Sequence, residues 1–71
     1  MIGTIVKIFS SAGYGFVKRL GHSPGDREIF FHCLDLADDL PFSEALIEQR
    51  VEFVLTRTAK DDEAREVRAA N

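Results

Sequence analysis

Gly13-Tyr14-Gly15-Phe16-Val17 is the stretch of this sequence that decides the fold, together with Ile29-Phe30-Phe31-His32 further along the chain. Successive side chains of an extended strand point to opposite faces, so the two rings of the first stretch share one face, as Phe30 and His32 do in the second. If the two strands pair, these rings lie side by side on one surface. Flat rings next to glycines are typical of a surface on which nucleic-acid bases stack, whereas branched aliphatic side chains are typical of a core.

The sequence around these stretches predicts five strands in all. β-branched and aromatic residues, which suit a pleated and half-buried surface, are concentrated in segments bounded by polar or glycine-rich turns. We expect the strands at residues 2–9, 14–20, 28–33, 49–58 and 64–69. In the first strand, apolar residues occur at both odd and even positions. This pattern indicates a bend or bulge that lets apolar side chains from both faces be buried.

Residues 34–47 interrupt the strand pattern, because several aspartates and Pro41 oppose a strand. We expect this segment to cross the end of the barrel, with Ser43 capping one helical turn through its hydroxyl group. Residues 21–27 hold two glycines and a proline, which predicts an exposed loop. Five short strands with one irregular crossover indicate a single all-β domain over residues 1–71. The expected architecture is a five-stranded antiparallel Greek-key barrel, the OB-fold, with an SH3-like barrel as the alternative.

Composition and charge exclude several classes of protein. The net charge is −3, but residues 1–27 hold four basic residues and one acidic residue, whereas the remainder holds five basic and eleven acidic residues. The glycine-aromatic stretch therefore lies in the basic part of an acidic chain. The single cysteine, Cys33, excludes an internal disulfide and a zinc site, and favours a reducing compartment. No apolar run approaches membrane-spanning length, so the expected location is the cytoplasm.

The residues able to contact a nucleic acid are the rings and the cations near them. The rings that fit stacking are Tyr14, Phe16 and Phe30. His32 can stack or donate a hydrogen bond. The cations that could meet phosphate groups are Lys7, Lys18, Arg57 and Lys60. A phenylalanine in a small domain is more often a core residue, and this interpretation suits Phe31 and Phe53.

The sequence indicates no enzyme chemistry. Ser10, Ser11 and Cys33 lack any local signature of a catalytic nucleophile, and no glycine loop of the phosphate-binding kind is present. His22 is expected to be an ordinary surface histidine. The carboxylates of the crossover lack the ligand spacing of a calcium loop. We therefore expect no catalytic residue, no metal and no cofactor.

The order of these motifs resembles the cold-shock domain, the OB-fold of bacterial cold-shock proteins and Y-box proteins that binds single-stranded nucleic acids. The likeness covers nearly the whole chain and rests on four segments: Ile5-Val6-Lys7-Ile8-Phe9, Gly13-Tyr14-Gly15-Phe16-Val17, Ile29-Phe30-Phe31-His32 and Gln49-Arg50-Val51-Glu52-Phe53. By this resemblance, the binding face holds Lys7, Phe9, Tyr14, Phe16, Phe30 and His32. The resemblance also implies Phe42 as a loop aromatic of that face and Lys60 as a basic residue in the last turn.

Three positions differ from the family pattern. Ile8 stands at the platform position where the family has a tryptophan, and we expect it too on the binding face. Cys33 stands where the family has a third aromatic after the histidine. Ala12 replaces the lysine that precedes the glycine-aromatic motif. A stacking ring is worth about 1–3 kcal/mol per base, so the expected affinity is lower than that of a member with every ring.

The expected function is that of a small module that binds single-stranded DNA or RNA with low sequence specificity. An RNA-chaperone or cold-shock-like regulatory role follows from the resemblance, and the expected state is a monomer, with a dimer as the alternative. The other function left open is a protein-interaction OB-domain with a degraded nucleic-acid face. Ile8, Cys33 and the negative net charge favour that alternative.

Overall fold

Five strands and two short 3₁₀ helices form the fold in a computed structural model, which describes residues 1–21 and 27–70. The strands are β1 (Ile2–Phe9), β2 (Tyr14–Arg19), β3 (Ile29–His32), β4 (Arg50–Arg57) and β5 (Asp62–Ala69). The 3₁₀ helices η1 (Cys33–Asp35) and η2 (Glu44–Leu46) lie between β3 and β4. Most of the loop predicted at 21–27, including His22, lies outside the described residues.

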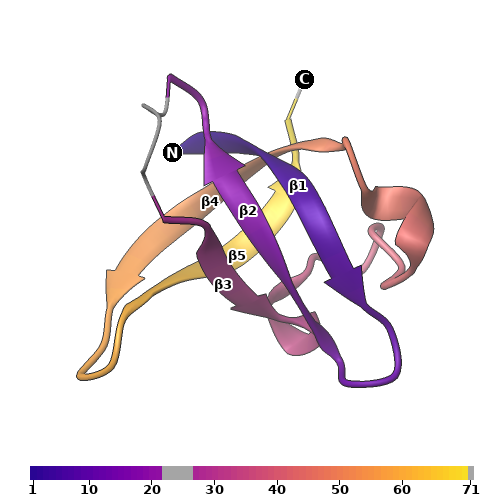
Figure 1. Cartoon of the computed structure of the whole chain (residues 1–71). Coiled ribbons are helices and arrows are strands. Elements are labelled where there is room, and N and C mark those ends of the chain that lie inside the picture. The colour runs from indigo at the N-terminus through magenta and orange to yellow at the C-terminus, as the bar shows by residue number, and fades with distance from the viewer. Residues whose placement is uncertain (22–26, 71) are drawn as a thin grey trace.

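The strands close into a barrel in the order β1-β2-β3-β5-β4, with β4 returning to β1 (Figure 1). All neighbouring strands are antiparallel except β3 and β5, which are parallel. The long β3–β4 crossover contacts β5 through η1 and β1 through η2. The predicted class, an all-β barrel of the OB-fold type, is confirmed.

The interior of the barrel is filled by aliphatic side chains around two phenylalanines. Phe31 is completely buried and Phe53 is 2% exposed, as the sequence predicted for these two rings. The other buried residues of this core are Ile5, Ile8, Val17, Ile29, Leu46, Val51, Ala64 and Val67. Full burial of one such large apolar side chain is worth about 1.5–3 kcal/mol, so these contacts are the main stabilising term in the barrel.

A bulge in β1 decides which residues of that strand face inward. Ile5 pairs with Val17, and the next paired residue, Lys7, faces Phe16, so one extra residue of β1 is accommodated between them. The extra residue reverses the alternation of the strand. Ile8 consequently points inward and is only 9% exposed, which makes its predicted place on the binding face wrong. The bulge itself was predicted.

Gly15 allows β1 and β2 to lie close together above Phe31. A Cβ atom at this position would lie 2.5 Å from the carbonyl oxygen of Lys7 and 2.9 Å from Cζ of Phe31. Gly15 is itself buried. The sequence suggested that glycines between the rings admit a ligand, but this glycine makes room for the packing of the barrel interior.

Two strand boundaries differ from the predicted ones where side chains cap a turn, and the other differences, at the end of β2, the start of β3 and both ends of β4, are one residue each. β3 ends at His32 instead of residue 33, because the imidazole of His32 accepts a hydrogen bond from the backbone of η1. β5 begins at Asp62, since the hydroxyl of Thr58 accepts bonds from the backbone nitrogens of Lys60 and Asp61 and closes the turn early. The predicted cap at Ser43 is confirmed: its hydroxyl accepts from the nitrogen of Ala45 at 3.3 Å.

Candidate nucleic-acid interface

Four aromatic rings lie together on the outer face of β1, β2 and β3. Tyr14 and Phe16 come from β2, Phe9 from β1 and Phe30 from β3, and we call these four residues the ring cluster. The register sets Phe16 opposite Phe30 and Phe9 opposite Tyr14. Directly opposed residues in an antiparallel pair have side chains on the same face, so the register gathers the rings. The predicted common face of Tyr14, Phe16 and Phe30 is thus what the fold produces.

The rings of the cluster contact one another in two ways. Tyr14 lies between Phe9 and Phe30 with centroid distances of 5.0 and 5.4 Å, and these pairs are tilted by only 30° and 32°. Phe16 instead meets its three neighbours nearly edge-on, at centroid distances of 5.9–6.1 Å. Offset and edge-on contacts are both favourable arrangements of aromatic rings. The cluster therefore holds its own shape, with Tyr14 at its centre.

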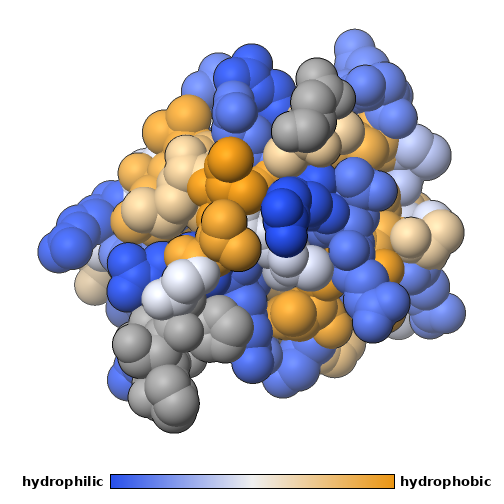
Figure 2. Space-filling model, turned by 90° about the horizontal axis from the view of Figure 1, so that it is seen from above, coloured by the Kyte–Doolittle hydropathy of each residue, from blue (hydrophilic) through white to orange (hydrophobic). Residues whose placement is uncertain are grey.

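The ring cluster remains accessible to solvent although the barrel core is complete without it. Phe9 is 41% exposed, and the other three rings are half-buried. Apolar residues also reach the surface elsewhere: on the face seen from above in Figure 2, they form patches separated by hydrophilic residues. What distinguishes the ring cluster is therefore its aromatic composition.

Only part of the positive charge near the ring cluster is available to a phosphate. The Nζ atom of Lys7 lies 6.0 Å from the ring centroid of Phe16, but also 3.1 Å from Oε1 of Glu28. Within the part of the chain that the structure describes, Lys18 and Lys60 have no ion-pair partner, and Lys18 lies beyond Phe16 on the same face of β2. Nε of Arg57 lies 4.0 Å from Oδ1 of Asp62, so this cation also has a carboxylate partner. Sequence reasoning missed Glu28, because a contact across strands leaves no local signal.

His32 lies at the end of β3, opposite Tyr14, and its side chain is exposed. Its Nδ1 atom accepts a hydrogen bond from the backbone nitrogen of Leu34 at 3.1 Å. Its own backbone nitrogen donates to Oδ2 of Asp35 at 3.2 Å. The predicted position of His32 beside the rings thus agrees with the register, and η1 fixes the orientation of the imidazole.

The two residues expected from the loops differ in position. Phe42 is half-buried and packs against the barrel core, and it makes no ring contact with the cluster among the residues described. Lys60, in the β4–β5 turn, lines a pocket of about 400 Å³ together with Phe30 and Glu63. The fold therefore brings Lys60 to the edge of the ring cluster but leaves Phe42 apart from it.

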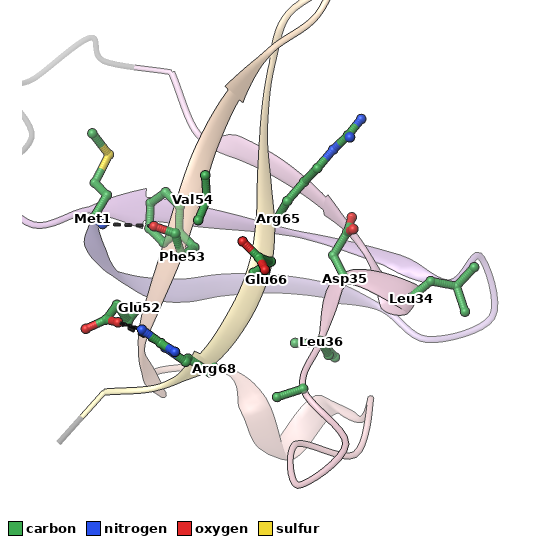
Figure 3. Close-up of a pocket in the computed structure, with 11 residues that line it drawn as sticks. Met1, Leu34, Asp35, Leu36, Glu52, Phe53, Val54, Arg65, Glu66 and Arg68 are labelled. Carbon is green, nitrogen blue, oxygen red and sulfur yellow. Dashed lines mark hydrogen bonds and ion pairs between the residues drawn. The ribbon is translucent and has the colours of Figure 1, made fainter.

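A larger concave surface, which encloses a pocket of about 580 Å³, lies outside β4 and β5, next to η1 (Figure 3). The backbone of Met1 pairs with that of Phe53 at one side, and Arg68 donates to Glu52 at another. Leu34, 86% exposed, points away from these residues in the close-up. None of the residues predicted to bind a nucleic acid lines this surface.

Among the residues described, no helix has both the length and the apolar character needed to span a membrane.

Comparisons with known proteins agree with the geometry. The family described as 'Cold-shock' DNA-binding domain matches residues 1–70. No curated protein matches the chain. Of 33 matching chains in solved structures, one is described as "drosophila Unr CSD456": it has 20% sequence identity and a TM-score of 0.75, and the match covers 99% of this chain. The match covers 26% of that chain, so the present sequence spans about a quarter of its length, and the likeness concerns the fold.

Proposed function

Since this chain belongs to the cold-shock domain family, whose domains bind nucleic acids, we propose that it binds single-stranded DNA or RNA by stacking bases on the ring cluster. The observation that carries the proposal is the position of the four rings, which lie in mutual contact on an accessible face while other residues fill the barrel. Base stacking requires accessible flat rings and tolerates any base, because every base has a π-face. Low sequence specificity follows.

The contact residues that we propose are the ring cluster, His32 beside it and three lysines around it. Lys18 and Lys60 are the cations without a described partner, whereas Lys7 has to separate from Glu28 to reach a phosphate. Ile8 is omitted because its side chain is buried. Phe42 is kept only as a secondary contact outside the ring cluster, since it packs against the core. A role as an RNA chaperone or cold-shock regulator would follow from such sequence-tolerant binding.

Tyrosine fluorescence tests the proposal directly, because Tyr14 is the only tyrosine and the chain has no tryptophan. Adding oligothymidine or single-stranded RNA at low salt should quench this fluorescence as a base covers the ring. Phe16→Ala and Phe30→Ala should each weaken binding by about 1–3 kcal/mol, which is roughly 5- to 150-fold. Both variants should stay folded, since neither ring is a core residue.

The matched control is Val54→Ala, which removes an apolar side chain that is 49% exposed and lines the surface outside β4 and β5. This change should leave the affinity for oligothymidine unaltered. Absence of both quenching and amide shifts on β1–β3 would contradict the proposal. Unfolding of the Phe16 or Phe30 variant would show that these rings are structural.

The second candidate function is that of a protein-contact domain. The observation that favours it is Leu34, which is 86% exposed on the rim of the larger concave surface. Leu34→Ser should then weaken association with a protein partner and leave oligonucleotide binding unchanged, whereas Phe30→Ala should do the reverse if the first candidate holds. The two functions are therefore separated by which variant loses binding.

A further inference from the structure

The junction between β3 and η1 holds His32 at two points, Nδ1 of the imidazole and the backbone nitrogen. Nδ1 of the ring lies 3.1 Å from the backbone nitrogen of Leu34, and the Sγ atom of Cys33 lies 3.7 Å from the same ring nitrogen. On the backbone side, the nitrogen of His32 lies 3.2 Å from Oδ2 of Asp35. Together, the bond from Leu34 and the bond to Asp35 form a reciprocal cap at the start of η1.

This geometry determines which nitrogen of the ring carries the proton. A backbone N–H group can only donate a hydrogen bond, so Nδ1 of His32 must accept from Leu34. In the neutral imidazole, the nitrogen that accepts has no proton and the other nitrogen carries it. The proton of neutral His32 is therefore on Nε2, the ring nitrogen that the cap leaves unused.

Asp35 is the residue that stabilises this arrangement. Its carboxylate accepts from the nitrogen of His32 and so holds the backbone of His32 at the position from which the imidazole reaches Leu34. The remaining titratable neighbours of the ring are Cys33, whose thiol can also donate to Nδ1, and Tyr14, the register partner on β2. Each donor at Nδ1 favours the same tautomer.

We propose that Asp35 is a positioning residue that makes His32 a fixed hydrogen-bond donor, through Nε2, toward a bound nucleic acid. This inference rests on the proposed function, because His32 lies on the face of the ring cluster, opposite Tyr14. Nε2–H requires an oxygen acceptor, which a phosphate group or a base carbonyl supplies. Asp35 itself lies in η1 and acts only through His32.

The first test is the tautomer of His32 in the ligand-free protein, measured from the imidazole nitrogen shifts by NMR at a pH where the ring is neutral. The wild-type chain should show a single tautomer with the proton on Nε2. Asp35→Ala should introduce a second population with the proton on Nδ1. Asp35→Asn should restore the wild-type pattern, because the amide oxygen still accepts a hydrogen bond.

The matched control is Asp38→Ala, which removes a carboxylate from the same crossover at a residue that is exposed. Asp38 has no ion pair or hydrogen bond in the described part of the chain. This variant changes the net charge as Asp35→Ala does, and it should leave the tautomer unchanged. A general effect of charge is thereby separated from the loss of the cap.

The second test is binding of oligothymidine. Asp35→Ala and His32→Ala should each lower the affinity by about five-fold, the equivalent of one ordinary hydrogen bond, and the double variant should lose no more than His32→Ala alone. An oligomer of the difluorotoluene deoxynucleoside, a thymine isostere without carbonyl oxygens, identifies the acceptor. A penalty that disappears on this ligand supports a base carbonyl, and one that persists supports a phosphate oxygen.

The proposal is overturned if free His32 carries its proton on Nδ1, or if Asp35→Ala changes neither the tautomer nor the affinity. Additive losses in the double variant would also overturn it, because they would make the two residues independent. If the wild-type chain does not bind oligothymidine at all, the proposed function fails. The tautomer measurement needs no ligand and still decides whether Asp35 positions the ring.

Discussion

Ile8 differs from its neighbours Lys7 and Phe9 because its side chain is inside the barrel while theirs are outside. The cause is the extra residue that β1 accommodates between Ile5 and Lys7, which reverses the alternation. Without that residue, position 8 would face the ligand side. The orientation of this one side chain therefore depends on a backbone irregularity two residues earlier.

Replacement of Ile8 by tryptophan, the residue of the family pattern, is expected to destabilise the barrel. The larger side chain would overfill the core, which typically costs about 1–3 kcal/mol. It should add no stacking ring, so the affinity for oligothymidine should not rise. Urea unfolding and a fluorescence titration measure the two quantities.

Ile8→Val is the control, since shortening a buried isoleucine by one methyl group typically costs only about 0.5–1.5 kcal/mol and leaves the surface unchanged. A tryptophan variant that is as stable as wild type and binds more tightly would mean that position 8 can face the ligand.

At the scale of elements, the alternation of apolar residues predicted the strands well. Val51 and Phe53 are buried as the pattern of the fourth strand required, and Val17 lies opposite the rings of β2. The errors lie at strand ends, where side-chain caps decide the boundary. Neither the cap by His32 nor that by Thr58 is visible as a periodic pattern, because each depends on side-chain hydrogen bonds within one turn.

The candidate site was predictable in its rings but not in its charges. Tyr14, Phe16 and Phe30 follow from the alternation of side chains, which is local, and from the pairing of two strands that are consecutive in the sequence. The pairing of Lys7 on β1 with Glu28, the residue before β3, spans β2 and depends on tertiary geometry that the sequence does not state. Phe42 shows the same limit, since its packing against the core depends on the path of the crossover.

The ion pair between β4 and β5 should make stability depend on pH. Glu52 lies opposite Arg68 in the register, and Nε of Arg68 donates to Oε1 of Glu52 at 2.9 Å. This hydrogen bond, together with the positive charge of Arg68, lowers the pKa of Glu52 below its ordinary value. The folded state then holds the proton less tightly than the unfolded state, so the stabilisation is present at neutral pH and is lost as the pH falls through the folded-state pKa.

Glu52→Gln should therefore lower the free energy of unfolding at neutral pH and have little effect in acid, where the wild-type carboxyl is protonated. The difference should be small, because both side chains are exposed to solvent. Urea denaturation at the two pH values measures it. Glu44→Gln, at an exposed carboxyl with no ion pair among the described residues, is the control, and an equal pH dependence in both variants would exclude the pair as its cause.

For the whole molecule, the uneven charge predicts binding that depends only weakly on salt. The net charge is −3, and only a few lysines surround the ring cluster. Two or three phosphate contacts to a single strand give a slope of log K against log salt of about −1.4 to −2.1. Titrations with oligothymidine at several salt concentrations measure this slope.

Glu28→Gln tests how the ion pair with Lys7 limits this charge. Loss of the carboxylate frees Lys7 for a phosphate, so binding should strengthen and the slope should steepen by about 0.7. Arg68, on β5, pairs with Glu52 on the surface outside β4 and β5, and Glu52→Gln therefore serves as a matched loss of one paired carboxylate that does not free Lys7. A slope that is unchanged in Glu28→Gln would exclude Lys7 as a phosphate contact.

Among the described residues, the parallel pairing of β3 with β5, called the seam below, has the fewest paired residues in the barrel. Within the described chain these strands pair only at Phe30 and Glu63, and Leu36 and Val67 form an isolated bridge further along. Native proteins open first where few hydrogen bonds hold the backbone. Backbone amides of β3 and β5 next to this seam should therefore exchange with deuterium sooner than those between β1 and β2. A base stacked on Phe30 would cover the seam, so bound single-stranded nucleic acid should slow this exchange and stabilise the closed barrel.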